Sequence, residues 1–166
     1  MSKIKTIDIT NACIIEIPTE IANLTNLESL SIRSSFLKRL PVELFTLPIL
    51  KHLDLKSNLL SELSCFVGNL KHLTHLNISD NAIKRLPVEI GKLTNLKEFY
   101  ANMCYLTELP DEIGNLKNLE TLSITFNFLS SLPTTLNNMA NLKYLYITGN
   151  EITTVSQKAQ NIIDQK

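Results

Sequence analysis

The chain has 166 residues, of which 44% are apolar, and its 16 basic and 16 acidic side chains give no formal net charge at pH 7. This length and apolar content suit one buried core, so we expect a single domain over residues 1–166. The balanced charge argues against nucleic acids and anionic membranes as partners, because both select a concentrated basic surface.

The N-terminal segment carries charged residues where a secretory signal needs an apolar run. No stretch approaches the roughly 20 apolar residues of a membrane span. We therefore expect a cytoplasmic protein, or one exported without a cleavable signal peptide. Three cysteines are an odd number and form no CxxC or Cys/His cluster, which favours reduced, buried thiols and predicts no metal site.

Apolar residues recur every 23 residues along the chain. Units in one unbroken register begin at Ile4, Leu27, Leu50, Leu73, Leu96, Leu119 and Leu142. The fourth position of each unit is also apolar, as in Ile7, Leu30 and Leu53, and the sixth position repeats the pattern. Seven supersecondary units that bury a continuous core against their neighbours are therefore predicted.

Each unit changes its apolar spacing part-way along. The first strand is expected near Thr6 to Ile9, as an open sheet edge that allows weak self-association. In the fourth unit, residues 73–78 include the period-2 spacing of a short strand, and residues 86–93 have helix-like spacing after Pro87, which we expect to start the helical turn. Successive strands should lie parallel. Residues 155–166 lack the proline and resemble a helical C-terminal cap.

The ninth position of the unit is rich in asparagine. It reads Ala12, Ser35, Asn58, Asn81, Cys104, Asn127 and Asn150. An inward asparagine can satisfy backbone groups of the turn that leaves the strand, which burial would otherwise leave unpaired. Cys104 occupies one of these inward positions, so we expect it to be structural and not a nucleophile.

The pattern LxxLxLxxNxLxxLPxxIxxLxx, with residues 73–95 as a near-consensus copy, resembles the leucine-rich repeat of the 23-residue LPxxIxxL type. It is similar to the repeats of cytoplasmic Ras-pathway scaffolds, plant intracellular Ras-group proteins and bacterial leucine-rich repeat proteins. The resemblance covers nearly the whole chain. It implies an α/β solenoid, a curved horseshoe segment with a parallel sheet on the concave side and short helical or 3-10 segments on the convex side. It implies no particular ligand.

Charged residues one repeat apart form columns that alternate in sign. The second position runs Lys5, Glu28, Lys51, Thr74, Lys97, Glu120, Lys143, and the thirteenth runs Glu16, Arg39, Glu62, Arg85, Glu108. Opposite charges would then lie beside each other on successive repeats, which discourages a slip by one repeat. We interpret these columns as part of the fold and not as a ligand site.

The third, fifth and seventh positions should face the concave side, where the repeat leaves the residue type free. Aromatic residues gather there in the C-terminal half: Tyr100, Tyr144 and Tyr146, bordered by Met103, Phe126 and Glu98. Exposed aromatic rings are enriched at binding hot spots. These residues are the predicted partner-binding site, whereas Tyr105 and Phe128 are expected to pack over the turn.

His52 and His75 should lie side by side on the concave face, with Asp54 on the same strand as His52. A weak metal site or a pH-sensitive contact would use such a pair, but a flat sheet surface lacks an enclosing second shell. We favour a polar contact surface and include both histidines in the partner-binding site.

The sequence predicts a non-catalytic module that binds a protein partner and needs no cofactor. It shows no paired catalytic side chains and no phosphate-binding loop, and its four glycines do not cluster. Two alternatives stay open: a bacterial effector, and a targeting or substrate-recognition domain of a larger assembly. An enzyme is the least favoured interpretation.

Overall fold

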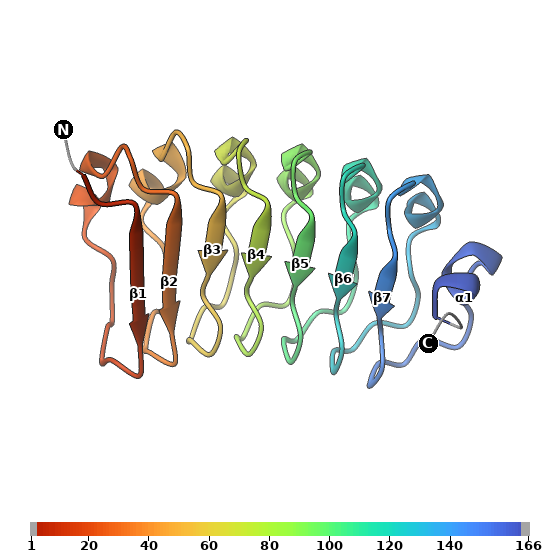
Figure 1. Ribbon diagram of the computed structural model, residues 1–166. Coiled ribbons are helices and arrows are strands. Elements are labelled where there is room, and N and C mark those ends of the chain that lie inside the picture. The colour runs from red at the N-terminus through yellow and green to blue at the C-terminus, as the bar shows by residue number, and fades with distance from the viewer. Residues whose placement is uncertain (1–2, 164–166) are drawn as a thin grey trace.

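The computed structural model describes residues 3–163 and contains one seven-stranded sheet whose strands follow sequence order (Figure 1). The strands are β1 (Thr6–Thr10), β2 (Ser29–Arg33), β3 (His52–Asp54), β4 (His75–Asn77), β5 (Glu98–Tyr100), β6 (Thr121–Ser123) and β7 (Tyr144–Tyr146). Every neighbouring pair is parallel, and residues 23 apart face each other, as His52 and His75 do. The predicted parallel solenoid is confirmed.

Short 3-10 helices lie opposite the sheet, one in each of the first six units. They are η1 (Thr19–Asn23), η2 (Val42–Thr46), η3 (Cys65–Asn69), η4 (Val88–Lys92), η5 (Asp111–Asn115) and η6 (Thr134–Asn138). Pro87, predicted to start the helical turn, instead lies just before η4 in an extended conformation, with φ −69° and ψ 147°. Its fixed φ suits this capping position, and its missing N–H leaves no donor unpaired. In the unit without this proline, the Ser64 side chain accepts a hydrogen bond from the Phe66 backbone N–H.

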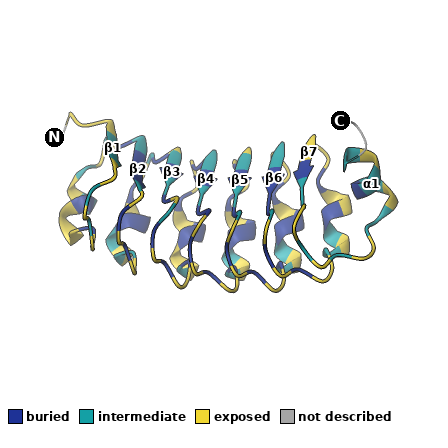
Figure 2. Ribbon diagram, turned by 90° about the horizontal axis from the view of Figure 1, so that it is seen from below, coloured by how far each residue is buried: buried dark blue, intermediate teal, exposed yellow. Residues whose placement is uncertain are grey.

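The core lies between the sheet and the 3-10 helices (Figure 2). In the central units the first, fourth and sixth positions are almost completely buried, as Leu73, Leu76 and Ile78 show. Each 3-10 helix adds apolar residues from the other side, for example Ile90 of η4. Burial of this apolar surface holds successive units together, because no unit could bury its apolar face alone.

The ninth-position residues are inside the solenoid, as predicted. Asn81 donates through Nδ2 to the carbonyl oxygens of Leu55 (3.0 Å), Ile78 (2.9 Å) and Ser79 (3.2 Å), and its Oδ1 accepts from the Leu60 backbone N–H (3.0 Å). Asn58 and Asn127 repeat this arrangement in their units. Each asparagine therefore links its own turn to the preceding repeat.

Cys104 takes the same position with a weaker donor. Its Sγ donates to the Ile78 carbonyl oxygen at 3.3 Å, where an asparagine would donate through Nδ2. Burial, followed by hydrogen bonds and the charge of Asp80, sets the thiol's acidity, and the net effect raises the pKa of Cys104 to about 11. A thiol that stays protonated near pH 7 suits the structural role predicted for it.

Cys13 and Cys65 are exposed, so the prediction of three buried thiols was wrong. Cys13 is at the tenth position, where the side chain leaves the turn outward, as the exposed Phe36 and Leu59 also do. Cys65 is the first residue of η3 and faces away from the core.

The charge columns form ion pairs in part. Glu28 lies between Lys5 (3.2 Å) and Lys51 (2.7 Å), and the hydrogen bonds from these ammonium groups lower the pKa of the Glu28 carboxyl. Lys143 pairs with Glu120 at 2.6 Å. Within residues 3–163, the thirteenth column contains one ion pair, between Arg85 and Glu108 (3.4 Å). The alternating charges at the second position therefore form ion pairs between successive repeats, whereas most charged side chains at the thirteenth position are too far apart to do so.

The two ends of the solenoid differ. Helix α1 (Gln157–Ile163) follows the last strand and buries Ala159, which confirms the helical cap; residues 164–166 of the predicted cap lie outside the described residues. β1 pairs with β2 on one side and forms the outer edge of the sheet (Figure 1). Self-association through that edge stays a prediction. Within residues 3–163, no helix has the length and apolar character needed to cross a bilayer.

Replacing Asn81 with alanine should lower the free energy of unfolding by about 1–3 kcal/mol, because three carbonyl oxygens and one N–H lose their buried partner. Chemical denaturation monitored by circular dichroism measures this loss. Lys84→Ala, at an exposed position of the same repeat, is the control and should change stability by less than about 0.5 kcal/mol. Equal unfolding midpoints for the two variants would contradict the structural role of the asparagine.

Candidate functional site

The three predicted tyrosines lie around a floor of small residues on the concave face. Tyr100 and Tyr146 are one strand either side of Ser123, and Thr121 lies beside Tyr144. Tyr144 is 54% exposed, while Tyr100 and Tyr146 are partly buried and Ser123 is buried. The structure therefore places the three tyrosine rings beside small side chains on neighbouring strands, and their role in binding stays a prediction.

Glu98, included in the predicted partner-binding site, already has partners within the chain. The Tyr100 hydroxyl donates to its Oε2 at 2.9 Å, and Nε2 of His75 lies 3.2 Å from its Oε1. Thr74 Oγ1 is 2.8 Å from Nδ1 of the same histidine. This hydrogen-bonded row holds the Tyr100 ring in one orientation.

The surroundings of Tyr100 affect its acidity. Burial, and then the hydrogen bond to Glu98, raise the pKa of Tyr100 to about 12. The Tyr100 hydroxyl therefore stays protonated and donates to the carboxylate at all pH values near neutrality. What Tyr100 offers a partner is the face of its ring.

His52 and His75 adjoin each other at the centre of the face, with ring centroids 5.5 Å apart and planes tilted by 40°. Burial, and then repulsion from a charged His75, lower the pKa of His52 below its ordinary value of 6.5. Over residues 3–163, no three His, Cys, Asp or Glu side chains are grouped to hold a metal ion. Both ring nitrogens of His75 are engaged by Thr74 and Glu98, so the hydrogen-bonding capacity left at this pair is on His52.

The N-terminal part of the concave face is occupied by internal polar contacts. Arg33 donates to both carboxylate oxygens of Asp8, at 3.0 and 3.2 Å, and these bonds lower the pKa of Asp8. The N-terminal half of the concave face therefore presents paired charged groups, whereas the C-terminal half presents tyrosine rings.

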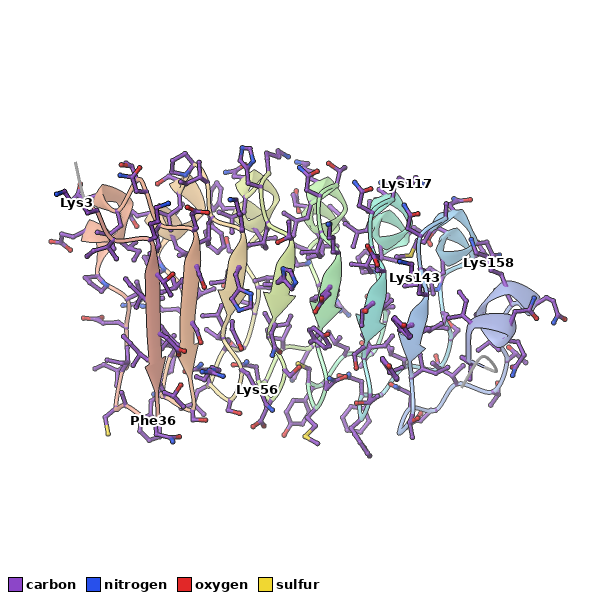
Figure 3. All side chains as sticks on the ribbon, in the orientation of Figure 1. Lys3, Phe36, Lys56, Lys117, Lys143 and Lys158 are labelled. Carbon is purple, nitrogen blue, oxygen red and sulfur yellow. The ribbon has the colours of Figure 1, made fainter. Side chains whose placement is uncertain are left out.

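Met103 and Phe126 do not lie on the concave face itself. They are in the turns that leave β5 and β6, at the edge of the sheet where Phe36 and Lys56 also lie (Figure 3). Tyr105 and Phe128 were predicted to pack over the turn, but both are about half exposed, and their rings stack on each other with centroids 6.0 Å apart. Sequence reasoning missed that these four residues form a surface of their own.

A polar cluster separates the two surfaces. Oδ1 of Asn102 accepts hydrogen bonds from Ser123 Oγ (2.7 Å), the Thr125 backbone N–H (2.8 Å) and Thr125 Oγ1 (3.0 Å). These bonds hold the seventh-position side chains in place between the tyrosines and the turns.

A family model of a leucine-rich repeat region matches residues 43–159. The chain belongs to the leucine-rich repeat proteins. No curated protein sequence matches it.

Solved structures of this family superpose closely on the chain. A leucine-rich repeat protein of Leptospira interrogans is 30% identical, with a TM-score of 0.85, over 89% of this chain and 38% of its own. The ectodomain of the Arabidopsis thaliana membrane receptor kinase GASSHO1/SCHENGEN3, in complex with Casparian strip integrity factor 2, is 28% identical, with a TM-score of 0.86, over 96% of this chain and 20% of its own. The plant peptide hormone receptor RGFR1 in complex with RGF2 is 32% identical, with a TM-score of 0.75, over 87% and 24%. This chain therefore spans well under half the length of these proteins.

His52 should titrate below pH 6.5 in an NMR titration of its ring protons, because burial and His75 both oppose its charged form. His75→Gln should raise the midpoint of His52 but leave it below 6.5, since burial remains. His72→Gln, at an exposed histidine away from the pair, is the control and should not move it.

The same shift links pH to stability. The unfolded chain binds a proton at His52 more readily than the folded chain, so stability should fall as the pH drops from 7 through the folded midpoint. A His52 midpoint at or above 6.5 would contradict the described environment.

Proposed function

We propose that this chain is a non-catalytic interaction module that binds a protein or peptide on the C-terminal half of its concave face, across Tyr100, Tyr144 and Tyr146. One observation carries the proposal: Tyr100 and Tyr146 flank the buried Ser123, and Tyr144 is exposed beside the small Thr121. Rings on either side of small side chains leave room for an extended chain to lie between them.

Tyrosine rings in this setting favour association. A ring buries a large apolar area on binding and has few rotamers to lose, so little entropy opposes the contact. The hydrogen bond to Glu98 restricts Tyr100 further before any partner arrives. His75 and His52 continue the surface toward the centre of the sheet, where His75 holds Glu98 and His52 adds hydrogen-bonding groups.

The solved relatives support a macromolecular partner. Two of the similar structures are plant receptors in complex with other molecules, RGFR1 with RGF2 and GASSHO1/SCHENGEN3 with Casparian strip integrity factor 2. Their family membership favours binding over catalysis, although each is much longer than this chain.

Replacing Tyr100 and Tyr146 together with alanine should weaken the partner complex by at least about 2 kcal/mol, because both rings lie at the proposed centre of the interface. The partner is first identified by affinity capture with the wild-type chain and mass spectrometry. Its dissociation constant for each variant is then measured by calorimetry.

Phe66→Ala is the matched control, because it removes an exposed aromatic ring from η3 on the opposite side of the solenoid. It should leave the affinity unchanged. Unaltered affinity in the tyrosine double variant would contradict the proposal, and so would a large loss of stability, which would show that the rings serve the core.

A further inference from the structure

The eighth position of every repeat has a left-handed backbone. Its φ values lie between 49° and 75°, at Asn11, Ser34, Ser57, Asp80, Met103, Phe126 and Gly149. Glycine adopts this conformation without strain, and asparagine and aspartate tolerate it because their short side chains bond locally. Methionine and phenylalanine gain no such compensation. Two consecutive repeats therefore carry bulky apolar side chains where the backbone disfavours them.

The core does not explain these two residues. Met103 and Phe126 are each 56% exposed, so their side chains contribute little to the buried interior. Tyr105 (52% exposed) and Phe128 (51% exposed) follow two residues later and stack on each other. An apolar surface of four large side chains thus gathers over the turns of two neighbouring repeats.

The Phe126 ring is held in place by the next repeat. A Cβ atom added to Gly149 would lie 2.5 Å from Cδ1 of the Phe126 ring, so the ring occupies space that any other residue at 149 would fill. Gly149 also has a φ of 75°, which favours glycine independently. The ring therefore lies against the Gly149 backbone in a defined position.

These side chains line an open hollow of about 520 Å³ on the surface, which we call the edge hollow. Met103, Tyr105, Phe126 and Phe128 form its apolar wall, and Asp80 and Asn81 contribute from the preceding repeat. Asn81 uses its side chain in hydrogen bonds inside the solenoid. It therefore offers an entering molecule little further hydrogen bonding.

Asp80 supplies the one charge among the residues that line the edge hollow. The residue is exposed, and across the part of the chain that the structure describes no Lys, Arg or His lies within 4.0 Å of its carboxylate. Asp80 lines the hollow itself, next to Asn81 and Ala82 and together with Met103 and Tyr105 of the following repeat. A carboxylate beside aromatic rings favours a cation, because the faces of the rings also attract positive charge.

We propose that the edge hollow binds an extended segment of a partner protein in which an arginine adjoins a leucine or a similar aliphatic residue. The aliphatic side chain fills the space between Met103 and the phenylalanine rings. The guanidinium pairs with Asp80 and stacks on an exposed ring, since its planar, weakly hydrated group suits both contacts. An acidic segment is rejected, because it would bring a second negative charge against Asp80.

The test uses the whole chain with a methyl-labelled methionine and two synthetic peptides. The probes are acetyl-Gly-Leu-Arg-Leu-Gly-amide and the same peptide with glutamate in place of arginine. Met103→Leu assigns the Met103 methyl signal. The arginine peptide should shift this signal in a saturable way, with at least tenfold higher affinity than the glutamate peptide. No saturable shift, or equal affinity for both peptides, overturns the proposal.

Charge variants locate the contact. Asp80→Asn should reduce the preference for arginine to less than threefold, whereas Asp111→Asn, which removes an exposed carboxylate from η5 on the opposite side, should leave it unchanged. The double variant Tyr100→Ala/Tyr146→Ala should bind the arginine peptide as the wild type does, so the edge hollow is tested independently of the concave site. Loss of peptide binding in that double variant would place the contact on the concave face and overturn the proposal.

A substitution at the strained position separates a binding role from a structural one. Phe126→Asn places a residue that tolerates the left-handed backbone at a site where the ring is exposed. It should keep or raise the thermal unfolding midpoint and weaken binding of the arginine peptide at least tenfold. A lower midpoint would show that the ring serves the fold. A wild-type dimer in light scattering that dissociates in this variant would show that the ring binds a second copy of the chain. Either result would overturn the proposal.

Discussion

The rest of this solenoid depends on the repeated turn at the ninth position, which hydrogen bonds stabilise wherever it carries an asparagine. Asn81 binds carbonyl oxygens of its own turn and of the preceding repeat, and it accepts from an N–H of that repeat as well. These bonds stabilise a turn in which the preceding residue is left-handed, and the same conformation precedes Ala12, Ser35 and Cys104, so it belongs to the backbone turn and not to the asparagine alone. Each repeat then stacks on the last with the same offset, and residues 23 apart become neighbours.

Because the repeats stack regularly, equivalent positions of successive repeats lie side by side in columns. Some columns are needed for the fold, and others are free to carry residues that serve a function. Apolar positions and the asparagine column are required for burial and for satisfying backbone groups, so their content reflects the fold. The third and fifth positions point outward from a rigid sheet and can change without cost to the core. Tyr100 and Tyr146 stand at such positions, and the sheet holds them one strand either side of Ser123. A rigid base of this kind reduces the entropy lost when a partner binds.

The periodic features of the structure were predictable, and the features that depend on single side chains were not. Strand register and the inward asparagines follow from spacing, and the helical cap was indicated by the loss of the repeat's proline after residue 155. The hydrogen bonds that join the Glu98 carboxylate to His75 and to the Tyr100 hydroxyl depend on rotamers that no repeat pattern specifies. The exposure of Cys13 was not predictable from the repeat pattern either, because its column also holds Phe36 and Leu59, whose apolar side chains indicate burial although both are exposed. By contrast, the asparagine, serine, aspartate and glycine of the eighth column indicate a left-handed backbone, against which Met103 and Phe126 stand out.

The concave tyrosines and the edge hollow occupy the same repeats, and this proximity has an energetic consequence. The Asn102 cluster fixes the short path between them, so the two surfaces keep a constant spacing in the free protein. A partner segment that contacts one surface meets the second at a high effective concentration, and two modest contacts then combine into a stronger one without new interactions. Under the two proposals, the aromatic rings on the sheet select an extended chain by shape, and Asp80 at the edge selects by charge. Affinity and specificity can therefore reside in different parts of one short stretch of solenoid.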